Sequence, residues 1–353
     1  MNNIKLSGVI KSSASSNIAL VKYWGKKGLQ IPENPSVSLS LCQSQSITEV
    51  AWEIKEDRTS ALEIEFYFEA QENIEFKQRV IKYFETIASL HAIPHHLKLK
   101  IKSHNTFPHS SGIASSASFM ASLALMVRHL DALINDLPTS GPEFSQAVSR
   151  LARIGSGSAC RSVYGPICLW GQLDGWRESS DEYAVPVQNY HDIFSDYRDT
   201  ILIVDSTPKK ISSPQGHQLM HEHPFKEKRY IQARENCKKL LDAIIMGDLA
   251  TFVRIVESEA LMLHGLMMTG TKPYILVKPN TLAIIDKIVR FREKTQIPVA
   301  FTLDAGPNLH LLYPNHFHEE VLAYIKRELV QFLENQNFIE DRVNAHPTTL
   351  EYI

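Results

Sequence analysis

One aspartate follows an apolar segment in the last fifth of the chain and precedes a turn. Asp304 lies in the segment TLDAGPN, residues 302–308, where Ala, Gly and Pro come directly after the carboxylate. A carboxylate at the end of a strand is a frequent position for a group that accepts or orients a proton. The same residues suit a turn that begins with Asp, so this segment alone supports both interpretations equally.

A second segment combines small residues with an arginine. Residues 155–161 read GSGSACR, so Ser156, Gly157 and Ser158 expose backbone amides close to Arg161. The arginine fork and the amides together suit a phosphate or a carboxylate. A helix end followed by a linker explains the same residues, and the segment alone does not separate the two interpretations.

A third segment, NTFPHSSGIASSAS at residues 105–118, places serines at the start of a predicted helix. Gly112 permits a sharp turn, and Ser115 and Ser116 open the helix. Free N–H groups at a helix N-terminus bind anions such as phosphate. A serine-capped helix is the more common explanation of such residues taken alone. Neither GxGxxG nor the P-loop pattern occurs, which argues against both of those nucleotide sites.

A fourth segment, NIALVKYWGKK at residues 17–27, carries two cations among aromatic residues. Lys22 and Lys26 are four residues apart and flank Tyr23 and Trp24. Two such cations could bind a diphosphate. Surface lysines whose stems cover apolar side chains are the more common outcome for a pair of this kind.

Three histidines cluster in GHQLMHEH, residues 216–223. His217 and His221 have the spacing of one helical turn, which suits a pair of metal ligands, and His223 follows. The sequence has no HExxH motif. We therefore favour a helix at the edge of a cleft, with polar contacts, over a metal site.

The elements that must position these residues are a mixture of helices and strands. They lack a regular βαβ alternation, which indicates two α+β domains. We place the boundary in the polar segment 175–198, so that the domains cover residues 1–190 and 191–353. Strands are predicted at 62–68, 97–102, 167–170, 201–204, 298–303 and 309–313. Helices are predicted at 115–130, 143–153, 224–246, 248–267, 280–294 and 317–333, with helical spacing also over 80–90. One face of the helix 248–267 carries Phe252, Ile255, Glu259, Met262 and Leu266.

Composition and charge narrow the class of protein. The 353 residues include 37 basic and 39 acidic ones, which gives a formal net charge of −2. Such a chain lacks the basic excess of nucleic-acid-binding proteins. Four cysteines without a CxxC pair favour reduced thiols in a cytoplasm. The N-terminal residues lack the apolar core of a signal peptide, and no apolar run approaches the roughly 20 residues of a membrane span. We expect a cytoplasmic protein.

Together the four segments resemble motifs of the GHMP family of small-molecule kinases, and within it those of the diphosphomevalonate decarboxylases. PHSSGIASSAS is similar to the family's ATP-phosphate loop. NIALVKYWGK, GSGSACRS and TLDAGPN are similar to three decarboxylase signatures and follow the family's order. The resemblance covers roughly residues 10–335.

The resemblance implies the GHMP kinase fold, with two α+β domains and an active site in the cleft between them. It also implies a reaction that uses ATP and Mg²⁺. ATP phosphorylates the tertiary 3-hydroxyl of mevalonate 5-diphosphate, phosphate and CO₂ then leave, and isopentenyl diphosphate forms. The expected partners are this small molecule, ATP and a second copy of the chain in a homodimer, with neither nucleic acid nor membrane.

The resemblance also implies roles for individual residues. Asp304 orients or deprotonates the 3-hydroxyl, Lys22 lies near that carboxylate and the phosphoryl group, and Arg161 contacts the substrate and helps to set Asp304. The expected substrate contacts are Tyr23, Trp24, Gly25, Lys26, Lys77, Ser156, Gly157, Ser158, Arg161 and Ser213. The expected ATP contacts are Ser111, Gly112, Ala114, Ser115 and Ser116. No protein metal site is assigned, because Mg²⁺ is expected to bind mainly through the ATP phosphates, with Ser116 as a candidate contact.

One segment departs from the family pattern. Residues 209–217 read KKISSPQGH, where family members usually carry Thr or Arg at the position of Pro214 and Met at that of His217. Proline has no N–H donor, so the neighbouring Ser212 or Ser213 is expected to take over its substrate contact.

Three alternatives to this function follow from the same residues. A decarboxylase acting on mevalonate 5-monophosphate would keep the same Asp, Lys and Arg, so the motifs do not separate it. A GHMP kinase without decarboxylation is disfavoured by Asp304 and Lys22 within intact decarboxylase signatures. A catalytically silent binding protein is disfavoured because every charged catalytic candidate is retained.

Overall fold

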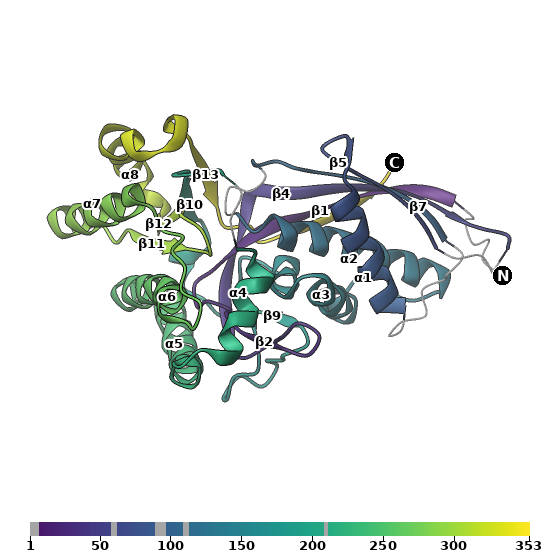
Figure 1. The fold of residues 1–353 in the computed structure, drawn as a ribbon, viewed down its shortest axis with the longest axis horizontal. Coiled ribbons are helices and arrows are strands. Elements are labelled where there is room, and N and C mark those ends of the chain that lie inside the picture. Colours follow the sequence, from purple (N-terminus) through teal and green to yellow (C-terminus); the bar gives the residue numbers. More distant parts are fainter. Residues whose placement is uncertain (1–6, 58–61, 89–96, 109–112, 208–210) are drawn as a thin grey trace.

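The computed structural model describes residues 7–57, 62–88, 97–108, 113–207 and 211–353, which form two lobes (Figure 1). The first lobe contains an eight-stranded sheet in which one strand pair is parallel and the others are antiparallel. The second lobe contains a four-stranded antiparallel sheet. Helices pack on both sheets, so the expected α+β class is confirmed.

Two long antiparallel strands form the centre of the first sheet. Its main path runs β14-β1-β4-β7-β5-β6, and β8 and β9 continue the sheet from β4. The strands are β1 (Ser7–Ala19), β4 (Ser36–Ile54), β5 (Glu63–Phe68), β6 (Gln71–Glu72), β7 (Leu97–Asn105), β8 (Ile167–Trp170), β9 (Ala184–Pro186) and β14 (Thr348–Tyr352). A separate short hairpin joins β2 (Lys26–Lys27) to β3 (Ile31–Pro32).

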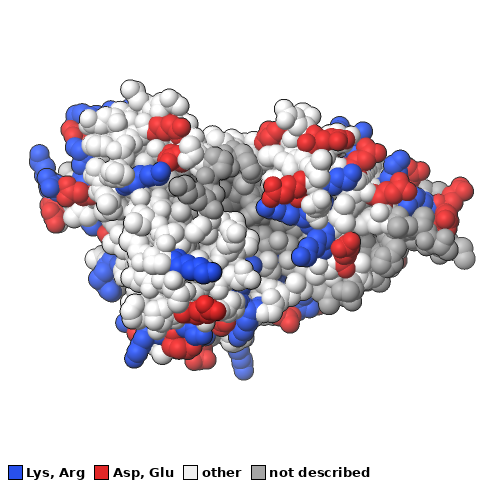
Figure 2. Space-filling model, in the orientation of Figure 1, with Lys and Arg blue, Asp and Glu red and all other residues white. Residues whose placement is uncertain are grey.

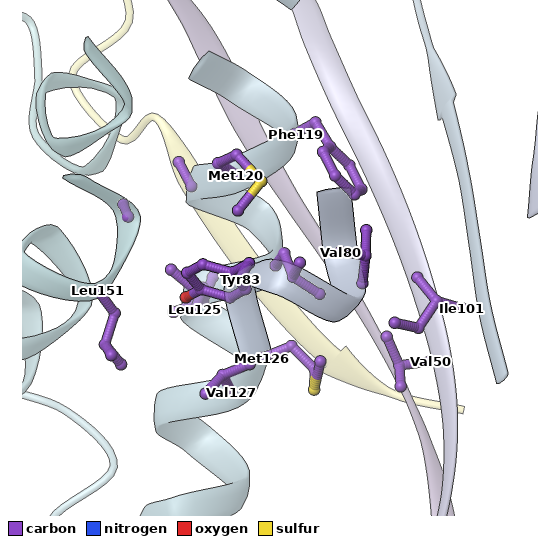
Figure 3. Packing of buried hydrophobic residues seen from close by; sticks show 14 of the residues in the cluster. Val50, Val80, Tyr83, Ile101, Phe119, Met120, Leu125, Met126, Val127 and Leu151 are labelled. Atoms are coloured by element: carbon purple, nitrogen blue, oxygen red, sulfur yellow. The ribbon is translucent and has the colours of Figure 1, made fainter. Parts of the chain in front are cut away.

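Three helices cover one face of this sheet: α1 (Ile74–Ala88), α2 (Ser115–Ile134) and α3 (Pro142–Gly155) (Figure 1). Figure 3 shows Val80 and Met126 from two of these helices facing the strands. By length and composition alone the helix α2 could cross a membrane. Most of its side chains are buried inside the protein, as in the core helix of a globular lobe.

Serine pairs join α2 to the sheet. The hydroxyls of Ser12 and Ser122 lie 2.9 Å apart, and those of Ser46 and Ser118 lie 2.7 Å apart. Buried hydroxyls are stable only with a hydrogen-bond partner, and each of these serines supplies one to the other. Small side chains therefore let the helix approach β1 and β4 closely. The serine content also explains why neither long strand is predicted from its apolar pattern.

The second lobe is assembled from the C-terminal part of the chain. Its sheet order is β11-β12-β10-β13. The strands are β10 (Tyr197–Leu202), β11 (Ala300–Leu303), β12 (Leu309–Pro314) and β13 (Phe338–Arg342). The helices are α5 (Lys226–Met246), α6 (Leu249–Thr269), α7 (Pro279–Thr295) and α8 (His318–Tyr324). A preceding short helix, α4 (Ser213–Leu219), lies beside the junction of the lobes.

The last helix predicted in this lobe, 317–333, is confirmed as a helical segment, but it is not a uniform α-helix. After α8 it continues as a π-helical turn at Ile325–Leu329 and a 3₁₀ turn at Val330–Phe332. Its apolar residues Val321, Ile325 and Leu329 are all buried.

The last strand of the chain returns to the first lobe. β14 pairs with β1, between Ile10 and Tyr352 at one end and Ala14 and Thr348 at the other. The division at residue 190 stays a prediction about domains. In the structure the C-terminal residues belong to the sheet of the first lobe.

A buried carboxylate on β13 fastens the two lobes together. The side chain of Asp341 accepts hydrogen bonds at 2.7–2.8 Å from the backbone N–H groups of Cys42, Gln43 and Ser44, which belong to β4. Asp341 is almost completely buried. Buried apolar side chains from both lobes form one continuous core around this junction.

We expect Asp341→Ala to lower the free energy of unfolding by at least about 2 kcal/mol, because three backbone donors lose a charged acceptor. Denaturant titration checks this against Glu351→Ala, which removes an exposed carboxylate from the neighbouring strand β14. That control is expected to change stability by less than about 1 kcal/mol. Equal stability of the two variants would contradict the fastening role of Asp341.

Candidate active site

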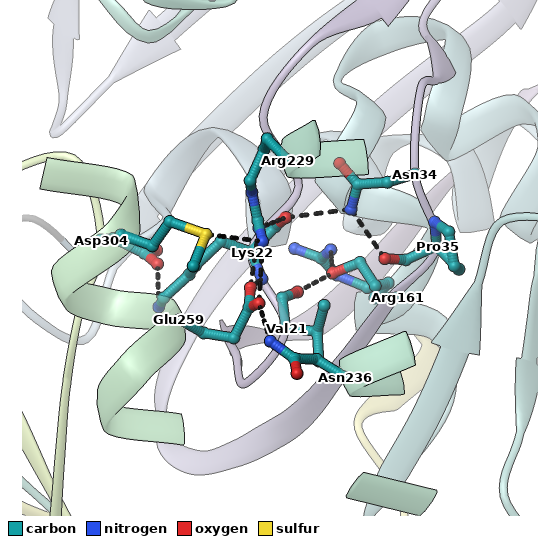
Figure 4. Close-up of polar contacts among 11 residues, drawn as sticks. Val21, Lys22, Asn34, Pro35, Arg161, Arg229, Asn236, Glu259 and Asp304 are labelled. Atoms are coloured by element: carbon teal, nitrogen blue, oxygen red, sulfur yellow. Dashed lines mark hydrogen bonds and ion pairs between the residues drawn. The ribbon is translucent and has the colours of Figure 1, made fainter. Parts of the chain in front are cut away.

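An ion pair between the two lobes is the centre of the site. Lys22 follows β1, Asp304 follows β11, and Lys22 Nζ lies 2.9 Å from Asp304 Oδ1 (Figure 4). The lysine is almost completely buried, whereas 28% of the Asp304 side chain is exposed. The carboxylate can therefore contact a ligand while it keeps its lysine partner.

The electrostatics of Lys22 reflect its burial. Desolvation lowers the pKa of its ammonium, the adjacent Asp304 raises it in part, and the nearby cation Arg161 lowers it further. The net result is a lowered pKa. An anion arriving beside this lysine would stabilise its charged form.

A second, fully buried ion pair fixes the backbone of Lys22. Glu259 of α6 and Arg229 of α5 form a bidentate pair with N–O distances of 2.7 and 2.8 Å. Glu259 Oε2 accepts a hydrogen bond from the Lys22 N–H, and Arg229 Nη2 donates to the Lys22 carbonyl. Asn34 donates a second hydrogen bond to that carbonyl. Both polar groups of the Lys22 backbone are thus held by the pair and its neighbours (Figure 4).

Arg229, Asn34 and Glu259 were not predicted as site residues. The sequence did contain a signal for Glu259, because it lies on the same face of its helix as Phe252 and Ile255. A carboxylate on a buried apolar face requires a partner. Which partner Glu259 would meet was not indicated by its neighbours in the chain.

Hydrogen bonds hold the loop that carries Asp304 on both sides. The Asp304 carbonyl accepts a hydrogen bond from Gly306 N–H and lies 3.1 Å from Nε2 of His264. Asn308 bonds the end of β10 through the N–H groups of Val204 and Asp205. The predicted strands on either side of this loop are confirmed as β11 and β12.

Arg161 is a buried cation with neutral partners. It lies in the 3₁₀ segment Gly157–Val163 and donates to the side-chain oxygens of Asn17 and Ser36. Within the described part of the chain no carboxylate forms an ion pair with it. The structure therefore brings Arg161 near Lys22, the partner of Asp304, and its expected contact with the substrate stays a prediction. A buried cation of this kind favours an anionic ligand.

The segment after Lys22 forms an aromatic wall. The ring of Tyr23 packs edge-on against Trp170 at 4.7 Å, and its hydroxyl is buried without a hydrogen-bond partner among the described residues. Gly25 has φ +104°, and a Cβ there would lie 2.3 Å from the Tyr230 hydroxyl. Only glycine fits this turn.

Small residues from the GSGSACR segment pack against this wall. A Cβ on Gly157 would lie 2.8 Å from the Tyr23 hydroxyl, so this glycine lies directly beside the tyrosine. The carbonyl of Ser158 accepts a hydrogen bond from Asn17, and Ser156 precedes the 3₁₀ segment. Of these three residues Gly157 lies beside Tyr23, and the substrate contacts expected for all three stay predictions.

Lys26 adds a positive charge next to this aromatic wall. Its ammonium donates to Gln30 at 2.9 Å within the β2–β3 hairpin, and partial burial lowers its pKa. Trp24 is buried and lies beside Gly216 of α4, where a Cβ would lie 2.5 Å from the indole ring.

Residues 211–217, the described part of the segment that departs from the family pattern, contain the start of the helix α4. Ser212 caps α4 in a capping box with Gln215, and Ser213 and Pro214 form its exposed first turn. The hydroxyl of Ser212 already bonds Gln215, so Ser213 is the serine that keeps an exposed hydroxyl. His217 is buried on α4, His221 is exposed, and the described residues include no group of three metal-ligating side chains.

The start of α2 has no side-chain cap. Its N-cap is Ala114, which has no side-chain acceptor, so the alternative of a serine-capped helix is not what the structure shows. Ser115 is half-buried and Ser116 is exposed. Ser111 and Gly112, the other expected ATP contacts, lie outside the described residues.

Lys77 lies in the first turn of α1, which packs against β5 and α3. The elements that carry Lys22, Arg161 and Asp304 are different ones. The substrate contact expected for Lys77 stays a prediction.

Known proteins share both lobes of this chain. Residues 14–182 match the model of the diphosphomevalonate decarboxylase-like N-terminal domain, and residues 200–351 match that of the mevalonate 5-diphosphate decarboxylase C-terminal domain. The diphosphomevalonate decarboxylase of Eremothecium gossypii is 31% identical over 327 residues, which cover 86% of this chain and 77% of the relative.

Solved structures agree with this relationship. The mevalonate diphosphate decarboxylase of Staphylococcus aureus superposes with a TM-score of 0.83 at 27% identity, covering 98% of this chain and 99% of the other. MDDEF in complex with MVAPP, AMPPCP and magnesium superposes with a TM-score of 0.82 at 25% identity, covering 98% and 100%. These likenesses establish the expected two-lobed α+β GHMP fold. From its sequence and its fold, the chain belongs to the diphosphomevalonate decarboxylase family.

Proposed function

We propose that this protein is an ATP-dependent decarboxylase that converts mevalonate 5-diphosphate to isopentenyl diphosphate, with ADP, phosphate and CO₂ as the other products. This reaction belongs to the mevalonate route of isoprenoid biosynthesis. The observation that carries the proposal is the Lys22–Asp304 pair, held between the lobes with its carboxylate partly exposed. The solved relative MDDEF, with MVAPP, AMPPCP and magnesium bound, supports this assignment of substrate and nucleotide.

The reaction begins with phosphoryl transfer to the tertiary hydroxyl. The Asp304 carboxylate orients this hydroxyl and accepts its proton as the oxygen attacks the γ-phosphorus, and the bond from that phosphorus to ADP breaks. Lys22 stabilises the charge on the phosphoryl group while it is transferred. The hydroxyl, a poor leaving group, has then become a phosphate, a good one.

Decarboxylation follows from the loss of that phosphate. When the C3–O bond breaks, phosphate leaves with the bonding electrons and positive charge develops at C3. The electrons of the C–CO₂ bond then form the new C=C bond, and CO₂ departs. Arg161 and Lys26 are proposed to hold the anionic substrate in place during this step.

We propose that Mg²⁺ binds mainly through the ATP phosphates. The candidate protein contact is Ser116, which is exposed at the start of α2. The ion would supply neutralisation of phosphate charge.

We also propose a cytoplasmic homodimer. The location is supported by four free cysteines, three of them buried, and the dimer by the family resemblance alone.

The proposed function predicts equal amounts of ADP and CO₂ from mevalonate 5-diphosphate, and no turnover when Mg²⁺ is chelated. A coupled assay with the mono- and diphosphate side by side measures both products. ADP without CO₂ would identify a kinase, and neither product would identify a binding protein. A strong preference for the monophosphate would identify the related decarboxylase.

Asp304→Asn is expected to lower kcat by at least about 10²-fold, because it removes the negative charge and the proton acceptor but keeps the shape of the turn. Single-turnover ADP formation at saturating substrate checks this, with ATP and substrate binding measured separately. Asp286→Asn, in an exposed ion pair of α7, is the control. Phosphoryl transfer at the parent rate in Asp304→Asn would disprove the role of Asp304.

Arg161→Lys is expected to lower kcat/KM at least tenfold although it keeps the charge, because lysine cannot bond Asn17, Ser36 and an anion with one planar fork. The matched control is Arg150→Lys, an exposed arginine on the preceding helix α3. Steady-state kinetics of both variants test the difference. Parent-like kinetics in Arg161→Lys would make Arg161 a purely structural cation.

A further inference from the structure

His217 lies inside the aromatic wall of the site. Its ring is 4.3 Å from the ring of Tyr23 and 4.6 Å from that of Trp24, measured between centroids. The helix α4 brings the histidine to this position, next to Gly216, which has no room for a side chain. Packing from these sides leaves the imidazole little freedom to rotate.

A hydrogen bond fixes the proton on the ring. The N–H of Gly25 donates to Nδ1 of His217 at 3.0 Å, so Nδ1 must be the unprotonated nitrogen. In a neutral imidazole the proton then lies on Nε2, which is a donor. Burial lowers the pKa of His217 to about 3, and the cations Lys26 and Arg161 lower it too. The ring is therefore neutral, with a donor at Nε2, over the whole physiological pH range.

The Nε2 donor is unpaired among the described residues, in a residue that is 7% exposed. Within the described residues Nε2 has no hydrogen-bond partner, and it is not among the fully enclosed polar atoms that lack one. Lys26 and Arg161 lower the pKa of His217, and they are also the two cations that we propose bind the anionic substrate. The donor thus lies in a region where positive charge already favours an anionic oxygen.

We propose that His217 binds an anionic oxygen of the substrate through Nε2–H, as a neutral donor held by Gly25 and the two aromatic rings. The proposal rests on the proposed function and adds to it a residue that determines substrate specificity.

Two substitutions distinguish a histidine that binds the substrate from one that only supports the backbone of Gly25. In His217→Asn the amide oxygen can still accept from Gly25 N–H, but the chain is too short to place a donor at the Nε2 position. In His217→Gln the amide nitrogen can reach the Nε2 position, but the acceptor for Gly25 is lost. His221→Asn, an exposed histidine just after α4, is the control.

We expect His217→Asn to raise the KM for mevalonate 5-diphosphate about tenfold or more, with a smaller change in kcat, because a hydrogen bond to a charged group is lost. His217→Gln should stay within about threefold of the parent KM, and so should the control. The opposite order, with Asn like the parent and Gln impaired, would overturn the proposal in favour of a brace. Equal loss of kcat in both variants would overturn it as well.

The parent enzyme serves two further measurements. Its release of ADP and CO₂ reports on the proposed function independently of any His217 variant. With ¹⁵N-labelled histidine, the Nε2 resonance of His217 should show a neutral Nε2–H tautomer and shift when mevalonate 5-diphosphate is added without ATP. An unshifted resonance at saturating substrate would overturn the proposal even if the variants failed to fold.

The oxygen that is bound can be identified with a shorter substrate. If the KM penalty of His217→Asn disappears with mevalonate 5-monophosphate, the partner is the terminal phosphate of the diphosphate. If the penalty persists, the partner is an oxygen that both substrates share. Either result supports the donor role.

Discussion

The buried pair of Arg229 and Glu259 is the contact on which the geometry of the site depends. Removing two charges from water is costly unless further hydrogen bonds satisfy them. Here Glu259 also accepts from Asn236 and from the backbone of Lys22, and Arg229 donates to the Lys22 carbonyl. The pair therefore binds both backbone polar groups of one residue of the other lobe. Two helices of the second lobe fix the position of a lysine that follows the first strand.

This arrangement leaves the site with more cations than carboxylates. Lys22 and Arg161 are buried and Lys26 is half-buried, whereas Asp304 is the one carboxylate in an ion pair with any of the three among the described residues. Cations in a poorly hydrated site attract anions more strongly than they would in water. The shortage of negative charge suits a substrate with several phosphate groups. The face shown in Figure 2 has no such bias, because acidic and basic side chains are interspersed over it.

The two lobes are joined at several points besides the site. Asp341 binds the backbone of β4 from the second lobe, β14 returns to the first sheet, and an apolar core crosses the junction. A site assembled from two lobes requires their relative position to be defined, since a displacement of about 1 Å can cost much of the rate. These contacts supply that definition on the side of the junction away from solvent.

The sequence by itself determined the family, the α+β class and most helices, because motifs of a few neighbouring residues and apolar periodicity are local properties. The loop around Asp304 was predicted for this reason, between two strands that the structure contains. The long strands β1 and β4 were not, because their serines become suitable for a core only when α2 supplies hydroxyl partners. The tertiary structure alone decided that Glu259 meets Lys22, 237 residues earlier, and that His217 lies between Tyr23 and Trp24. Such contacts depend on how distant elements pack against each other. The residues next to a given position in the chain therefore do not predict them.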